Sequence, residues 1–124
     1  MPETHPYTLE AALSQPIHPS PHFPTVQAHC LSFPDAVEDD PWGDIVYKIK
    51  GKLFAATGRS VPLQVTVKAE PADADSLIRQ PFIERAAYVG RYGWVTVTVE
   101  DTETLNLLLG LIEVSYGLVR RKRS

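Results

Sequence analysis

Three lysines lie close together at positions that could bind phosphate groups. Lys48 and Lys52 lie on either side of the dipeptide Lys50-Gly51, which can form a two-residue hairpin turn because glycine readily accepts a positive φ. The lysines then lie at the tip of a β-hairpin and do not line one face of a groove. A cationic tip can contact nucleic-acid phosphates without reading sequence. Lysines on a hairpin can equally serve to prevent edge-to-edge strand pairing.

Further cations and aromatic side chains follow in the second half of the chain. Arg59 and Lys68 could extend a cationic surface, and Arg91 lies beside Tyr92 and Trp94. Stacking on single-stranded bases uses basic and aromatic side chains together, although the same aromatics can pack in a core or at a sheet edge. The candidate DNA-binding residues are therefore Lys48, Lys50, Lys52, Arg59, Lys68, Arg91, Tyr92 and Trp94.

Residue types suited to catalysis or metal binding are present but poorly spaced. The acids at 38–40 are consecutive and lack the alternating spacing of a calcium loop. His18 and His22 are separated by prolines, which prevent the helix that would align them. Cys30 falls on an apolar stripe with no activating base nearby. We therefore expect no catalytic residue, no metal site, no cofactor and no small-molecule ligand, and an enzyme is disfavoured.

The charged residues are unevenly distributed along the chain, whose net charge is −3. Residues 1–47 contain seven acids and no lysine or arginine, whereas residues 48–124 contain twelve basic and eight acidic residues. The cluster at 120–123 could contact phosphate, or it could complement the negative end of the preceding helix dipole. This asymmetry bears on a partner without identifying one.

The chain divides into an extension, one domain and a short tail. Residues 1–24 contain six of the eleven prolines, which disfavour regular structure, and form a proline-rich N-terminal extension. Residues 25–120 have the apolar patterning of a folded domain, with Thr25 as a helix N-cap, and residues 121–124 form a basic tail. No apolar run is long enough to cross a bilayer and no signal peptide is visible, so a cytoplasmic protein is the default expectation.

Apolar periodicity predicts an α+β fold for the domain. Alternating and β-branched segments predict four strands, and spacings of three and four predict three helices. An acidic, proline-containing loop is expected at 38–43. With Lys50-Gly51 as the turn, Ile49 opposes Lys52 and Tyr47 opposes Phe54. The expected elements are a helix starting at 25, strands at 45–49, 52–56, 63–68 and 94–99, and helices at 72–79 and 102–120. This order suggests a two-layer sandwich of a mainly antiparallel sheet and helices, with a long C-terminal helix.

The last predicted helix is apolar on two faces. One face contains Leu105, Leu108 and Ile112, and the other contains Leu107 and Leu111. A small domain can bury one such face against its own sheet. The second face requires the N-terminal extension, another helix or a second subunit. A homodimer is therefore one expectation.

Several segments in the same order resemble the MmcQ/YjbR family of small bacterial proteins. The resemblance covers roughly residues 25–120, and is carried by His29–Ala36, Pro41–Gly43, Val46–Ile49, Gly51–Ala55, Val67–Ala69, Gly93–Val95 and Ser115–Val119. It implies a compact α+β domain similar to secretion chaperones and the CyaY-like grouping. It also implies DNA binding through β-hairpin wings. The chain departs from the family in residues 1–24 and at Gly90–Gly93, which replaces a more basic segment.

Two functions follow as alternatives. The first is a small, non-enzymatic cytoplasmic protein that binds DNA weakly and non-specifically through its cationic hairpins. The second is a homodimeric module that binds a protein or peptide through its sheet or the apolar C-terminal helix. The two differ in salt dependence, because only phosphate contacts release condensed counterions.

Overall fold

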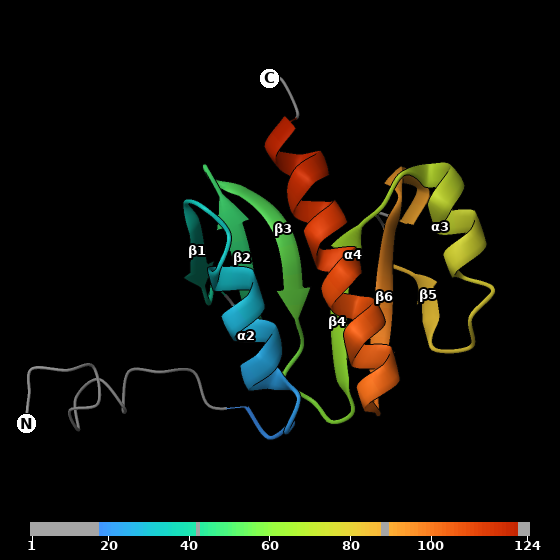
Figure 1. Ribbon diagram of the computed structural model, residues 1–124, viewed down its shortest axis with the longest axis horizontal. Coiled ribbons are helices and arrows are strands. Elements are labelled where there is room, and N and C mark those ends of the chain that lie inside the picture. The colour runs from blue at the N-terminus through green and yellow to red at the C-terminus, as the bar shows by residue number, and fades with distance from the viewer. Residues whose placement is uncertain (1–17, 42, 88–89, 122–124) are drawn as a thin grey trace, which may run out of the picture.

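The structure is a computed structural model that describes residues 18–41, 43–87 and 90–121, with only the backbone of Arg91 (Figure 1). Six antiparallel strands form one sheet in the order β1-β2-β3-β4-β6-β5. Helices α2 and α4 pack on one face of this sheet, and α3 packs beside β5 and β6. The elements are α2 (Phe23–Leu31), β1 (Ala36–Asp39), β2 (Ile45–Ile49), β3 (Lys52–Thr57), β4 (Leu63–Lys68), α3 (Pro71–Leu77), β5 (Ile83–Arg85), the 3-10 turn η1 (Gly90–Tyr92), β6 (Trp94–Val99) and α4 (Thr102–Arg121). The expected α+β class, antiparallel sheet and long C-terminal helix are confirmed.

Two edge strands and one helix start differ from the sequence predictions. Residues 36–39 form β1, where a loop was expected from residue 38, and β5 was not predicted. Both strands are short and carry charged residues, which are typical of sheet edges and hide the strand pattern. Helix α2 begins at Phe23, two residues before Thr25. Pro24 lies in its first turn, where the missing N–H costs no hydrogen bond.

The β2–β3 hairpin contains the predicted turn but a different register beyond it. Lys50 and Gly51 both have positive φ, as a tight two-residue hairpin turn requires. Ile49 pairs with Lys52 as expected, but Tyr47 pairs with Ala55 and not with Phe54. Phe54 is the extra residue of a β-bulge, so the pairing shifts by one position. Because of the bulge, Phe54 and Ala55 are both buried.

The core lies between the sheet and the inner face of α4. Alternate residues of β4 and β6 point into it, and Leu108 and Ile112 of α4 cover them. Tyr116 stacks on Phe33 at a centroid distance of 4.6 Å and meets Phe54 edge-on. The Tyr116 hydroxyl donates a hydrogen bond to the carbonyl of Pro34, which ties α4 to the loop after α2. One of the two predicted apolar faces of α4 therefore forms the core.

Helix α4 begins with a carboxylate cap. The Asp101 side chain accepts a hydrogen bond of 2.7 Å from the backbone N–H of Thr104. This hydrogen bond holds the pKa of Asp101 below its usual range. The cap satisfies one of the donors that every helix start leaves unpaired. It fixes the start of α4 at the end of the sheet where β6 finishes.

A buried serine of α4 joins β3 to β4 where these strands separate. The two strands pair from Thr57 to Ala55 of β3, and their pairing stops before Phe54. There the Ser115 hydroxyl donates to the Phe54 carbonyl at 2.6 Å and accepts from the Lys68 backbone N–H at 2.9 Å. The hydroxyl replaces the missing ladder hydrogen bond between the strands. Figure 1 shows β3 curving away from β4 beyond this point.

Substituting Ser115 with alanine should destabilise the fold because a buried carbonyl and an N–H would lose their partner. We expect the free energy of unfolding to fall by about 2 kcal/mol, measured by urea denaturation. Ser32→Ala is the matched control. The Ser32 hydroxyl is exposed and bonds only the His29 carbonyl, so its loss should change stability by less than about 0.5 kcal/mol. Equal losses for the two variants would contradict the bridging role.

Candidate nucleic-acid interface

Strand direction brings several of the predicted cations to one end of the sheet. Strands β2 and β4 finish at this end, and β3 and β6 start there. Helix α4 also finishes there, so its last turn and the β2–β3 turn lie at the same end (Figure 1). The resulting cationic end consists of Lys50, Lys52, Lys68, Arg120 and Arg121. Residues separated by more than fifty positions in sequence thus come together.

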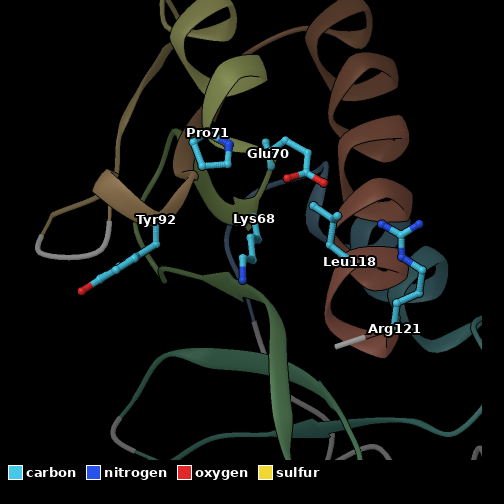
Figure 2. Close-up of a pocket in the computed structure, with 7 residues that line it drawn as sticks. Lys68, Glu70, Pro71, Tyr92, Leu118 and Arg121 are labelled. Atoms are coloured by element: carbon cyan, nitrogen blue, oxygen red, sulfur yellow. The ribbon is translucent and has the colours of Figure 1, made fainter. Parts of the chain in front are cut away.

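A shallow depression of about 480 Å³ lies at the cationic end, over the gap between β4 and the last turn of α4. Its lining combines two cations, one acid and one aromatic ring with apolar groups. Figure 2 shows the Tyr92 ring on one side of Lys68 and Arg121 on the other, beyond Leu118. The lining residues are Lys68, Ala69, Glu70, Pro71, Tyr92, Leu118 and Arg121. Such a surface can hold an anionic group between Lys68 and Arg121 with a planar ring against Tyr92.

Lys48 and Arg59 are engaged by acids outside the cationic end. The Lys48 ammonium lies 3.1 Å from the Asp39 carboxylate on the neighbouring strand, and its hydrogen bond holds the pKa of Asp39 below the usual range. Arg59 lies in the loop between β3 and β4, at the opposite end of the sheet. Its guanidinium bonds Asp40 at 2.6 Å and the Gly43 carbonyl. Arg59 therefore lies away from the other candidate residues, whereas Lys48 lies on the same hairpin as Lys50 and Lys52 with its ammonium directed to Asp39.

The aromatic candidates lie beside Lys68. Trp94 pairs with Lys68 across β6 and β4 and is half-buried. Tyr92 ends η1 and has 53% of its surface exposed. Arg91 lies in the same turn, and its side chain is outside the described part of the chain. Lys68, Tyr92 and Trp94 thus form one continuous group.

Arg121 joins this group although it was not among the candidate residues. The sequence offered a signal in the basic cluster at 120–123, which the helix dipole also explains. Only the packing of α4 on the sheet shows that Arg121 reaches the same depression as Lys68. Arg120 instead lies over the Tyr116 ring, with its guanidinium carbon 5.9 Å from the ring centroid.

Gly93 fixes the position of Tyr92 and Trp94 relative to Lys68. Its backbone φ is +98°, a value that residues other than glycine rarely adopt. A Cβ at this position would lie 2.0 Å from the Ala69 carbonyl oxygen, and the Ala69 N–H bonds the Gly93 carbonyl at 2.9 Å. The close backbone approach therefore requires glycine here.

Replacing Gly93 with alanine should displace the segment after β4 and strain the backbone. We expect a loss of about 3 kcal/mol in the free energy of unfolding, measured by chemical denaturation. Gly58→Ala is the control, because a Cβ at Gly58 meets no atom within 4 Å and its φ is not positive. A Gly93→Ala protein as stable as Gly58→Ala would show that the contact with Ala69 does not constrain this turn.

The described residues contain no grouping of three or more histidine, cysteine, aspartate or glutamate side chains suited to a metal ion. Cys30 is buried, and burial together with the nearby Glu38 carboxylate raises the pKa of its thiol to about 12. The thiolate, which is the nucleophilic form, is therefore scarce at neutral pH. Within the described ranges, no helix is long and apolar enough to span a membrane.

The Cys30 thiol should react slowly with a disulfide reagent in the folded protein. Its raised pKa and complete burial both oppose formation of an accessible thiolate. We expect labelling at neutral pH to be slower than in the denatured chain by more than about a hundredfold, as followed by absorbance. Rapid labelling of the native protein would contradict the buried placement of Cys30.

The sequence as a whole matches the YjbR family profile over residues 31–118. The chain belongs to the YjbR family. Two solved structures resemble this YjbR-family protein. The crystal structure of the Deinococcus radiodurans protein DR2400, with the domain DUF419, has 26% identity and a TM-score of 0.73, covering 81% of this chain and 79% of that one. A Pseudomonas syringae protein solved as structural-genomics target PsR293 has 20% identity and a TM-score of 0.63, covering 78% and 97%, and shows the shared fold alone.

A comparison with curated proteins gave no match. The resemblance seen in the sequence is thus confirmed at the level of the family and the fold. The matched range contains the β2–β3 hairpin, Lys68 and Tyr92, and it ends before Arg121.

Proposed function

We propose that this YjbR-family protein is a non-enzymatic, cytoplasmic DNA-binding protein that contacts phosphates through its cationic end. The observation that carries the proposal is the convergence of Lys50, Lys52 and Lys68 with the C-terminal arginines of α4 on one end of the sheet. Cations on three separate segments, the β2–β3 hairpin, β4 and α4, can follow a phosphate backbone. They supply affinity without sequence readout.

The charge around this surface predicts weak binding. The same end carries the carboxylates of Asp35, Glu70 and Asp73, which oppose a polyanion. Glu70 lies in the lining of the depression itself, where Figure 2 shows its carboxylate directed towards α4. A dissociation constant of roughly 10⁻⁴–10⁻⁶ M at physiological salt is typical of non-specific binding. Tyr92, next to Lys68, would add stacking if a base were unpaired.

Neutralising a phosphate-contacting lysine should lower the salt dependence of DNA binding. We expect Lys68→Gln to reduce the slope of log affinity against log salt by about one, and Lys50→Gln with Lys68→Gln by about two. Fluorescence anisotropy of a labelled duplex, titrated with the full chain at several salt concentrations, gives this slope. A single-stranded probe run in parallel tests whether Tyr92→Ala lowers affinity only for unpaired bases.

Arg79→Gln is the matched control for these lysine variants. Arg79 is exposed and follows the end of α3, which starts at the cationic end and leads away from it (Figure 1). It removes one positive charge, as Lys68→Gln does, and should leave the salt slope unchanged. Binding that is absent even at low salt, or lost equally in Arg79→Gln, would overturn the proposal.

A further inference from the structure

The outer face of α4, opposite the core, carries a largely exposed stripe, of which Leu107 and Val114 also line the groove between α4 and α3. Residues at alternating spacings of four and three run along this face from the first turn to the last. Leu107 and Val114 have 38% and 46% of their surfaces exposed, which is high for large apolar side chains. A Cβ added at Gly110 or Gly117 would meet no atom within 4 Å. The α4 stripe consists of Glu103, Leu107, Gly110, Val114, Gly117 and Arg121.

The α4 stripe is complementary to itself when reversed. Each residue has a counterpart equally far from residue 112 on the other side, so an antiparallel copy places the two opposite each other. The acid at one end then meets the base at the other, and each large side chain meets a glycine. The facing pairs are Glu103 with Arg121, Leu107 with Gly117, and Gly110 with Val114.

We propose that two copies of this chain associate through antiparallel packing of their α4 helices, centred on residue 112. Residues spaced alternately by four and three positions lie along the line of contact between two packed helices. In an antiparallel pair, a residue followed by a spacing of three faces one followed by a spacing of four. Glycine at the seam allows the helix axes to approach closely, so that Val114 fills the space above Gly110 of the partner subunit. Antiparallel helix dipoles add a favourable interaction.

A second copy fits this face better than an unrelated partner because of its charge and shape. Glu103 at the start and Arg121 at the end form two ion pairs with a reversed copy and none with a parallel one. On one side of the stripe, α3 and α4 enclose an apolar groove of about 400 Å³ lined by Leu77 and Leu111 together with Leu107 and Val114 of the stripe. Leu111 lies next to the symmetry axis on that side, so the same residue of the partner subunit would cover the groove.

One contact at the axis opposes association. Glu113 flanks the stripe on the side away from Leu111 and is exposed. Reversal brings it close to Glu113 of the partner subunit, and like charges at this distance repel. The dimer is therefore expected to be of moderate affinity. Removing the Glu113 charge should therefore strengthen the dimer, which a general loss of surface polarity would not do.

Charge exchange at the ends of the stripe tests the proposed register. Sedimentation equilibrium of the full chain measures the monomer–dimer constant, and we expect a dimer at tens of micromolar, roughly. Glu103→Arg and Arg121→Glu should each raise the dissociation constant about tenfold, because each converts two attractive pairs into repulsive ones. The double variant restores opposite charges and should return the constant to near its original value. Glu113→Gln should lower the constant.

Gly110→Gln separates association from folding. Its side chain has open space within one copy and should preserve the fold, whereas it blocks the approach of Val114 from the partner subunit. We expect this variant to be a folded monomer by circular dichroism and sedimentation. A monomeric parent chain, a dimeric Gly110→Gln protein, or a double charge variant no tighter than either single one would each overturn the proposal. These measurements are made without DNA, and Glu103 and Gly110 lie outside the cationic end, so a failure of dimerisation is distinguishable from a failure of DNA binding. Arg121 is the one exchanged residue that belongs to both surfaces.

Discussion

The Ser115 hydroxyl holds together the two halves of the sheet at the point where they diverge. Strands β3 and β4 pair over only three positions, and beyond them the hydroxyl spans the gap between the Phe54 carbonyl and the Lys68 N–H. The bulge at Phe54 turns the β2–β3 hairpin away from β4 at the same level. The helix thus supplies hydrogen bonds that the sheet lacks, which permits the strands to separate without leaving buried polar groups unpaired. The depression lined by Lys68 and Arg121 lies at the end where the strands separate.

Helix α4 consequently connects three properties of the molecule. Its inner face fills the core, Ser115 bridges two strands, and its last turn adds cations beside Lys68. Its outer face retains exposed Leu107 and Val114. The two apolar faces apparent in the sequence therefore differ in burial. One is buried within the domain, and the other remains at the surface.

The strong periodic segments were predictable from the sequence, and the features that depend on long-range contacts were not. Strands β4 and β6 and helix α4 have apolar patterns long enough to identify their type. Short edge strands with charged residues, such as β1, lack that signal. The β-bulge depends on burying both Phe54 and Ala55 against α4, which local sequence does not encode. Likewise, the pairing of Lys48 with Asp39 and of Arg59 with Asp40 depends on register and loop packing. For this reason the sequence could not show that Tyr92 and Trp94 lie beside Lys68 whereas Arg59 lies at the opposite end of the sheet.

The separation of charge along the strands has an electrical consequence. The end opposite the cations carries Asp40, Asp44, Glu100, Asp101 and Glu103, with Arg59 held against Asp40. The described part of the chain therefore has a dipole moment aligned roughly with β4, although the net charge of the whole protein is −3. In the non-uniform field near any highly charged surface, a dipole experiences a torque before contact. The molecule would approach a negatively charged surface with its cationic end first, so the orientation of an encounter is governed by how charge is arranged and not by its sum.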